Sequence, residues 1–432
     1  MYWLVIIGVL VTLFVKKRLI DPYLEYKRLV GQQGVSVHPK SKFLPFLGDL
    51  PTLLKMQITD ANGRHISTNL MTAFAQDARN QLPPKNYADA IYNKRGIQGM
   101  LSIANPETVN DLLSVQSKIQ DKASMLSDAL HDLTGDSFLF SKGDDAWKAK
   151  RKAVGPAFYK EKLRNIFESH KGIVQQFMDK WSAGIKEHGS TRIDMRKELK
   201  NLYSATIFVS IFGEDFSQEP IHLIDIDTGA PFVKPLFEAM LEVGPPCIQM
   251  ISHPIRVLCS SRFGKYRFTT KERRVRQNCN SVRAFAFDQI QKRKAGVTKS
   301  KLGSSDVLQV LLDNETAFGA SNEKEIVDQL MDLFLAGVVT VQNTTLSIIH
   351  WSIRRNDVLK KIRHDIDTTV VKGNKTIREA LEYELIFEMN YLNTVFQESL
   401  RYSNVAQFLT PLKLMEDTVL KPNLHLKKGD EL

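Results

Sequence analysis

The chain has 432 residues, 43% of them hydrophobic and 25% charged, which is enough apolar sequence to bury a large core. Its length is compatible with two or three domains or with one large helical domain. The 59 Lys and Arg residues exceed the 48 Asp and Glu residues, and the formal net charge of +11 favours an anionic membrane surface or nucleic acid. Nucleic-acid binding is not expected, because the second of two basic clusters, Lys271–Arg276 with Arg283 and the run Lys292–Lys294 beyond it, lacks the interleaved aromatic side chains of a base-stacking surface.

The N-terminal segment is an unbroken apolar stretch, Tyr2–Val15, followed at once by the basic cluster Lys16–Arg18. A membrane span needs about 17 to 25 residues, so this stretch is short, although flanking lysines can extend it and the ER bilayer is thin. The alternatives are a signal peptide, which would need preceding basic residues and a cleavage site, and a buried helix. We expect residues 1–19 to form an uncleaved N-terminal membrane anchor, with the rest of the chain in the cytosol by the positive-inside rule.

Residues 20–50 are expected to form a linker, because three prolines and a glycine are closely spaced between residues 39 and 51. The folded domain is then expected to occupy residues 51–432. Within it, Met100–Ile103 alternates weakly and predicts a strand, which ends at Asn105 before a helix. Few other segments carry strand patterns, whereas most of residues 144–295 show helical spacing, so the predicted fold class is mostly α with small β-sheets.

Trp147 and Arg151 lie four residues apart in a basic stretch, so on a helix they share one face. Together they offer an indole N–H and a guanidinium fork to a common acceptor, most naturally an anion. The alternative is a basic surface helix with one packed tryptophan.

The three cysteines, Cys247, Cys259 and Cys279, form no CxxC motif and no Cys/His metal spacing. The sequence therefore predicts neither a disulfide framework nor a zinc site. A reduced, cytosolic setting fits this cysteine usage best.

One long helix is predicted from Asn322, where Asn322 and Glu325 resemble a capping box, to Trp351. Its middle, residues 333–341, is apolar on every face, so the helix should cross the interior of the protein. Gly337 and Thr340 interrupt this run, and a helix-interior glycine one turn before a hydroxyl suggests that something flat or bulky approaches the backbone. The alternative is a packing glycine and a threonine that bonds back to its own helix.

Glu398 and Arg401 lie three residues apart at the end of a further apolar run, so they can pair on one helix face. An ordinary exposed pair of this kind contributes little to stability. By itself this motif is weak.

In this order and spacing, Trp147-x-x-x-Arg151, the run from Ala336 to Thr340 and Glu398-x-x-Arg401 resemble the cytochrome P-450 superfamily of haem-thiolate monooxygenases, in its membrane-anchored eukaryotic type. Each motif alone is loose, and their joint occurrence carries the resemblance. It extends from about residue 39 to the last residue, including a tail, residues 417–429, that resembles the family's strand pair ahead of a lysine-glycine turn. The resemblance implies a cytochrome P-450-like fold with a long central helix over haem b.

The resemblance also implies roles for the helical motifs on either side of the central helix. Trp147 and Arg151 match the positions that bind a haem propionate. Glu398 and Arg401 match a structural pair that is buried in the core behind the haem, so that removing one partner would leave an unpaired buried charge.

On the central helix, Thr340 matches the threonine beside the oxygen site, and Ala336 and Gly337 match the stretch that lies close over the porphyrin. Val339 departs from the family, because an Asp or Glu usually precedes the threonine there. Gln342 lies about 200° around the helix from Thr340, and its neighbour Asn343 about 300°, so at most one of them could approach the same face. Thr340 is therefore expected to be the one protein relay for protons on this helix.

Two further departures concern the cofactor. No cysteine of the chain lies in the glycine-rich loop that delivers the family's axial ligand, so no metal ligand is assigned and the axial cysteine is expected beyond Leu432. The arginine that completes the Glu398 and Arg401 cluster is missing with that loop, and Leu412 stands near the place of another propionate-binding arginine. The sequence is thus expected to be C-terminally incomplete.

The resulting hypothesis is an ER-anchored haem monooxygenase that activates O2 to oxidise a lipophilic small molecule. Electrons would come from NADPH through a reductase partner, and the catalytic domain would be cytosolic. Two alternatives stay open, a truncated non-catalytic paralogue that binds no haem and a haem-thiolate rearrangement enzyme, the latter suggested only by Val339.

Overall fold

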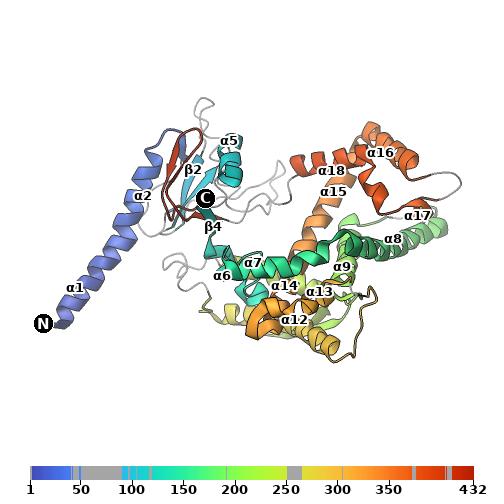
Figure 1. Ribbon diagram of the computed structural model, residues 1–432, viewed down its shortest axis with the longest axis horizontal. Helices are drawn as coiled ribbons and strands as arrows, with labels where there is room; N and C mark the ends of the chain where they lie inside the picture. Colours follow the sequence, from blue (N-terminus) through green and yellow to red (C-terminus); the bar gives the residue numbers. More distant parts are fainter. Residues whose placement is uncertain are drawn as a thin grey trace. The chain divides into compact units, whose positions relative to one another are not determined.

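The computed structural model describes residues 2–39, 41, 48–49, 90–95, 98–103, 105–115, 119–190, 192–250, 265–303, 305–371, 376–403, 405 and 411–432. The chain divides into two compact units. Unit 1 comprises Met1–Ala129, Ile248–Tyr266 and Phe408–Leu432, and unit 2 comprises Leu130–Cys247 and Arg267–Gln407. Figure 1 shows the small sheets of unit 1 and the helices of unit 2.

The chain begins with the apolar helix α1 (Tyr2–Val15), which continues through a π-helical turn (Lys16–Ile20) into α2 (Asp21–Val30). The apolar side chains of α1 are exposed from Ile6 onward. At about 1.5 Å per residue its 14 residues span roughly 21 Å, less than the ~30 Å hydrocarbon core of a bilayer. The structure thus shows a short apolar helix here. Among the residues that the structure describes, the helical stretch long and apolar enough to cross a membrane, by length and composition only, is residues 322–354.

Unit 1 is built on a three-stranded sheet of β1 (Val35–Val37), β2 (Ala90–Arg95) and β3 (Gln98–Ile103). β1 runs parallel to β2, and β2 runs antiparallel to β3. Strand β3 confirms the predicted strand over Met100–Ile103, and the predicted helix follows as α5 (Pro106–Asn110). The Asn105 side chain caps α5, because its Oδ1 accepts the N–H groups of the second and third following residues.

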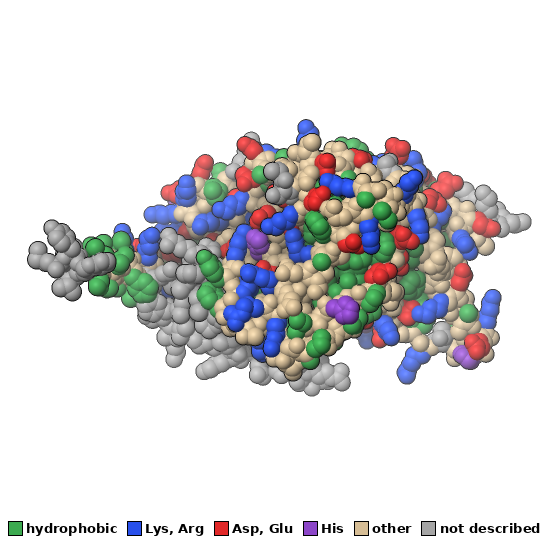
Figure 2. Space-filling view, turned by 90° about the horizontal axis from the view of Figure 1, so that it is seen from below, with side chains coloured by type: hydrophobic (Ala, Val, Ile, Leu, Met, Phe, Trp, Pro, Cys, Tyr) green, Lys and Arg blue, Asp and Glu red, His purple; other side chains and the backbone are tan. Residues whose placement is uncertain are grey.

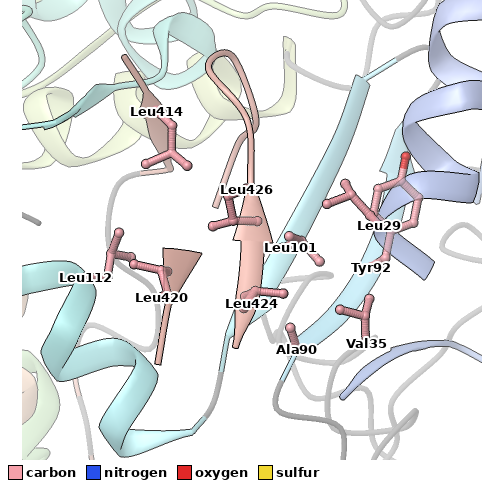
Figure 3. Packing of buried hydrophobic residues seen from close by; sticks show 10 residues of the cluster. All are labelled: Leu29, Val35, Ala90, Tyr92, Leu101, Leu112, Leu414, Leu420, Leu424 and Leu426. Atoms are coloured by element: carbon pink, nitrogen blue, oxygen red, sulfur yellow. The ribbon is translucent and has the colours of Figure 1, made fainter. Parts of the chain in front are cut away.

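Residues 21–37 are not a linker, and the prediction of a linker over residues 20–50 is wrong there. Leu29 of α2 and Val35 of β1 belong to the apolar core of unit 1, together with Tyr92 and Leu101 of the sheet (Figure 3). Side chains that bury apolar surface stabilise the folded state, so this segment is held by packing. The proline spacing that suggested a linker begins only at Pro39, beyond β1.

The C-terminal tail completes the same core. β8 (Thr418–Leu420) and β9 (Leu424–Leu426) pair antiparallel, which confirms the predicted strand pair, and Gly429 adopts a φ of 97° in the turn that follows. β7 (Leu412–Leu414) pairs antiparallel with β4 (Gln120–Lys122). Leucines from β7, β8 and β9 pack into the core with Leu112, which lies in the π-helical segment Asp111–Val115.

Unit 2 is mostly helical, as the sequence predicted. Its 3-10 segments are Gly155–Phe158, Glu315–Ser321 and Glu384–Phe387. The helices that lie in it or lead into and out of it are α6 (Ser124–Thr134), α7 (Asp145–Val154), α8 (Lys160–His188), α9 (Met195–Phe212), α10 (Leu236–Gln249), α12 (Thr270–Lys294), α13 (Val307–Asp313), α14 (Asn322–Gly337), α15 (Val339–Arg354), α16 (Asn356–Thr369), α17 (Ile377–Ala380) and α18 (Asn390–Tyr402).

A hairpin of unit 2 was not predicted. β5 (Pro220–Ile224) and β6 (Pro231–Pro235) pair antiparallel across a turn in which Asp225 accepts the backbone N–H and the hydroxyl of Thr228. Gly229 takes a φ of 85° there. The signal was present as an Asp-Thr-Gly turn between two short apolar runs.

The central helix is the predicted one, but it is interrupted. α14 packs against α9, α12 and α13, and α15 packs against α9, α16 and α18 (Figure 1). Val338, with φ −95° and ψ −66°, separates the two halves. The Thr340 hydroxyl donates to the Ala336 carbonyl, which is the acceptor that the Thr340 backbone N–H would use in a regular helix, and such back-bonding bends helices.

The start of α14 also differs from the predicted capping box. The Asn322 side chain accepts the N–H of the next residue, Glu323, and the Glu325 carboxylate forms an ion pair with Lys150 at 2.8 Å. Glu325 is therefore used to tie α14 to α7.

Basic residues of unit 2 are paired with carboxylates of the same unit. Arg293 binds Asp306 at 3.0 Å with both side chains buried, and Lys294 binds Glu315 and Glu323. On the face seen in Figure 2, Lys and Arg side chains are interspersed with Asp and Glu side chains. The basic cluster at the end of α12 is thus held within the fold.

Candidate functional site

Helix α7 presents the first motif as the sequence predicted. Asp144 caps the helix by accepting the Trp147 backbone N–H at 2.8 Å. Trp147 and Arg151 lie on one face, with the Arg151 guanidinium 5.7 Å from the centre of the indole ring. Trp147 is half-buried and Arg151 is exposed. The pair therefore presents a cation whose planar group is supported by an aromatic ring.

The Trp147 indole N–H is directed to the protein backbone. Its Nε1 donates to the Phe138 carbonyl at 2.7 Å. In this conformation the Arg151 guanidinium is the group of the pair that is exposed to an external anion. The sequence predicted one acceptor shared by both side chains, whereas the indole N–H has a backbone acceptor of its own. Helical spacing could not predict this acceptor, because Phe138 lies outside α7.

The second motif exposes a narrow face of the central helix. Ala336 and Thr340, four residues apart, are both exposed, and the Thr340 hydroxyl donates to the Ala336 carbonyl. The predicted alternative, a threonine bonded back to its own helix, is thus what the structure contains. The hydroxyl oxygen can still accept a hydrogen bond while it donates this one.

Gly337 faces a different direction from the one that the resemblance implied. A Cβ built on Gly337 would lie 2.5 Å from Cδ1 of Ile207, a side chain of α9. The missing side chain therefore allows α9 to pack closely on the central helix. The exposed face beside it is provided by Ala336.

The residues around Thr340 divide between the two sides of the helix. Gln342 is buried and its Nε2 donates to the Arg196 carbonyl at 2.7 Å, so this amide is directed to the start of α9. Val339 and Asn343 are exposed with Thr340. The prediction that at most one of the two amides could approach the face of Thr340 agrees with this arrangement.

Glu398 and Arg401 form the predicted pair on α18. Arg401 donates from Nε and Nη2 to the two carboxylate oxygens, at 2.7 and 2.5 Å. The side chains of Glu398 and Arg401 are 59% and 68% exposed. The resemblance implied a buried pair, and the structure instead shows an exposed one. The hydrogen bonds from Arg401 hold the pKa of the Glu398 carboxyl below its usual range, and the pKa of Arg401 is raised by the same contact.

Three polar residues of α14 were not recognised from the sequence. Asp328, Gln329 and Asp332 are 2%, 0% and 1% exposed, and each accepts a backbone N–H from residues 136–139. The signal was three polar side chains within one turn of an otherwise apolar helix. Buried polar groups require hydrogen-bond partners, so such a cluster predicts a second segment beside the helix.

Two of the cysteines are unsuitable as metal ligands. Cys247 and Cys279 are fully buried, and their sulfur atoms lie 3.6 Å apart without a disulfide. The contact with Cys247 and burial raise the pKa of the Cys279 thiol far above its usual range, which disfavours the thiolate that binds iron. Cys259 lies outside the described residues. Within those residues, no group of three or more His, Cys, Asp or Glu side chains is placed to hold a metal ion.

Comparison with known proteins identifies the family. The family model for cytochrome P-450 matches residues 84–432. The chain belongs to the cytochrome P-450 family. The match includes all seven residues that the sequence analysis assigned to a site.

Similar proteins are distant in sequence and longer than this chain. A self-sufficient cytochrome P-450 monooxygenase, CYP505E5, of Aspergillus niger is 24% identical over 272 residues, covering 61% of this chain and 23% of that protein. Cytochrome P-450 CYP94D109 of Paris polyphylla is 23% identical over 346 residues, covering 76% and 63%. The 7-deoxyloganic acid hydroxylase of Catharanthus roseus is 25% identical over 333 residues, covering 71% and 56%. The chain thus matches less than two thirds of the length of each of these relatives.

The family implies haem, a flat macrocycle that carries two carboxylates. Arg151 offers an exposed guanidinium to a carboxylate, with the centre of the Trp147 ring 5.7 Å away. Ala336 and Thr340 offer a small exposed surface and a hydroxyl. These residues fit such a group, whereas Cys247 and Cys279 do not fit as its axial ligand.

Proposed function

We propose that this protein is a haem-dependent monooxygenase that activates O2 to oxidise a lipophilic small molecule. The observation that carries the proposal is the family match over residues 84–432, within which Arg151 and Thr340 are both exposed in unit 2. Its distant relatives include proteins named monooxygenase and hydroxylase.

Haem, when bound, would supply the O2 chemistry. Arg151 would bind a propionate, and Trp147 would cover one face of its guanidinium. Ala336, with only a methyl group, would permit the close approach of the ring, and Gly337 would keep α9 against the helix from the other side. Thr340 would hold a proton near the reacting oxygen, because its hydroxyl both donates and accepts.

Cys247 and Cys279 would not hold the haem iron, since both are buried against each other. The expected cysteine beyond Leu432 stays a prediction. A reductase that passes electrons from NADPH is the partner that this proposal requires.

We further propose that α1 anchors the protein to the ER membrane, with the domain in the cytosol. The support is the exposed apolar surface of Ile6–Val15 and the basic residues Lys16 and Lys17 behind it. The protein should stay in the membrane fraction after alkaline extraction and be digested by protease added from the cytosolic side. Release by alkali, or protection of the bulk of the chain, would contradict this placement.

The function is tested by turnover. The chain extended by a segment that carries the expected iron-ligating cysteine, in membranes and supplied with haem, NADPH, a reductase and isotopically labelled O2, is expected to place one labelled oxygen atom in a lipophilic product. Product formation should require NADPH and should fall in Arg151→Ala, while Lys148→Ala, which removes an exposed lysine of the same helix, should leave it unchanged.

The alternatives give different results in the same assay. A chain that binds haem but converts a lipid hydroperoxide without NADPH would be a rearrangement enzyme, the alternative suggested by Val339. A chain that takes up no haem would be a non-catalytic member of the family.

A further inference from the structure

Residues 135–139, at the start of the connection from α6 to α7, form a tight turn against the central helix. Gly135 takes a φ of 53°, and a Cβ built there would lie about 2.1 Å from the Asp328 carboxylate. A side chain at this position would separate the turn from α14. The glycine therefore permits the turn to contact a buried polar surface of the helix.

Three acceptors on α14 hold this turn by its backbone. Asp328 accepts the N–H of Asp136 at 2.9 Å, Gln329 accepts that of Phe138 at 2.9 Å, and Asp332 accepts that of Leu139 at 3.1 Å. The acceptors are spaced along one turn of the helix, and the donors are nearly consecutive. A shift of the turn along the helix would break all three contacts together.

Basic side chains fix the same segment from its other sides. Arg283 of α12 donates to the Leu133 carbonyl at 2.7 Å and binds Asp328 at 2.5 Å. Lys150 of α7 donates to the Asp136 carbonyl at 2.8 Å and pairs with Glu325 at 2.8 Å. Charged groups buried in this way are held by several directed bonds, so the turn has one preferred position.

This turn also holds the indole of Trp147, whose N–H donates to it. The Phe138 N–H donates to the Gln329 side chain, and the Phe138 carbonyl accepts the indole N–H of Trp147. One residue of the turn thus connects α14 to α7. The guanidinium of Arg151 lies over that indole. A continuous set of contacts thus runs from the central helix, through Phe138 and Trp147, to the Arg151 guanidinium, which is the group exposed to an external anion.

We propose that Asp328, Gln329 and Asp332 are positioning residues, which set the orientation of Trp147, and through it of Arg151, by holding the backbone of residues 136–139. The inference rests on the proposed function at one point, because it takes the anion that Arg151 binds to be a carboxylate of haem. The three side chains are buried and accept hydrogen bonds from the backbone of residues 136–139. They act through the Phe138 peptide.

The test uses the full chain labelled with fluorotryptophan and observed by fluorine NMR, with the Trp147 signal assigned by Trp147→Phe. Gln329→Met keeps side-chain length and helix propensity but removes the acceptor of the Phe138 N–H. We expect the Trp147 signal to shift or broaden while those of Trp181 and Trp351 stay. Amide exchange at residues 136–139 should accelerate roughly five- to tenfold, as for the loss of one net hydrogen bond.

Two variants separate positioning from a general loss of stability. Gln289→Met removes another buried glutamine of unit 2, on α12, and should leave the Trp147 signal and the exchange of residues 136–139 unchanged. If Gln329→Met does not fold, Asp332→Asn weakens one acceptor without changing its size and should alter the same two signals to a smaller degree.

An unchanged Trp147 signal and unchanged exchange in a folded Gln329→Met chain would overturn the proposal. Haem titration of Arg151→Ala answers a separate question. Unweakened haem binding in that variant would refute the assignment of the anion, whereas the NMR and exchange results decide the positioning role without any haem present.

Discussion

At the scale of single residues, Thr340 has the clearest chemical consequence. Its hydroxyl donates to the Ala336 carbonyl, and the side chain is exposed beside Val339, which has no polar atom. Gln342 is engaged by the Arg196 carbonyl on the buried side. Thr340 is therefore the hydroxyl that this face of the central helix can offer for proton transfer.

We predict that Thr340→Ala uncouples the enzyme, lowering product formation roughly 10²-fold, because a positioned acid–base group typically contributes 10²–10⁴-fold. Peroxide released per NADPH consumed should rise. Thr340→Ser, which keeps the hydroxyl, is the matched control and should stay close to wild type. Val339→Asp should improve coupling, since an exposed carboxylate there could connect the hydroxyl to solvent. Unchanged peroxide release in Thr340→Ala would refute the relay and favour the rearrangement alternative.

The residue scale also shows what the sequence could and could not predict about the site. The shared face of Trp147 and Arg151 follows from a spacing of four residues and is confirmed. The partner of the indole, the Phe138 carbonyl, depends on where a separate turn packs, and local spacing carries no information about it. The direction of Gly337 toward Ile207 was likewise unpredictable, because the contact is made by another helix.

At the scale of elements, helix existence was predicted better than helix continuity. The end of α9 at Gly213, with a φ of 77°, follows from a local signal, because a glycine in the left-handed conformation commonly ends a helix. The central helix is interrupted at Val338, next to the hydrogen bond from the Thr340 hydroxyl to the Ala336 carbonyl, and hydropathy does not report this interruption. β1 was missed because its three residues are too few to show an alternating pattern.

On α18, the exposure of the Glu398 and Arg401 pair reverses an expectation of the sequence. A buried pair would make the loss of either partner severely destabilising, but both of these side chains are largely exposed. We therefore predict that Arg401→Ala leaves the thermal unfolding midpoint of the 432-residue chain essentially unchanged. The pKa of Glu398 should return toward its usual range in this variant, because its largest lowering contact is removed.

The measurement compares the thermal unfolding midpoints of Arg401→Ala and a control, Lys361→Ala. The control changes an exposed basic residue of the neighbouring helix α16. A fall of the midpoint in Arg401→Ala alone would show that the pair does become buried in the protein in solution. That result would support the role that the family resemblance implies.

At the scale of the whole molecule, unit 1 joins the two ends of the sequence. Arg28 of α2 forms an ion pair with Asp430 at 2.5 Å, and the Gln32 side chain is bonded to the backbone of His425 at both its amide nitrogen and its oxygen. These contacts span about 400 residues of sequence, so no local pattern predicts them. They also place a half-buried carboxyl group, that of Glu25, close to a second acid, Asp430.

Glu25 gives unit 1 a stability that depends on pH. Its side chain lies against Gly99 and accepts a weak hydrogen bond from the Tyr92 hydroxyl at 3.4 Å. Burial, with the nearby charge of Asp430, raises the pKa of Glu25 from 4.5 to about 7, although Arg28 opposes the shift. Since the folded pKa exceeds the unfolded one, the folded state binds the proton more tightly.

The sign of the effect follows from this difference. The stabilising contribution is fully present below about pH 4.5 and is lost as the pH rises through about 7. A shift of this size corresponds to about 3 kcal/mol of unfolding free energy. Glu25→Gln, which mimics the protonated carboxyl, should therefore match the wild type at pH 4.5 and exceed it by about that amount at pH 8.

Urea unfolding of the full chain at several pH values between 4.5 and 8 measures this difference, because the contribution of all other groups cancels between wild type and variant. Glu107→Gln, at an exposed carboxyl of the same unit, is the matched control and should show no growing difference. The contrary outcome is a difference in unfolding free energy between wild type and Glu25→Gln that stays constant from pH 4.5 to 8. It would mean that Glu25 titrates alike in the folded and unfolded states. The packing of its carboxyl against β3 would then not persist in solution.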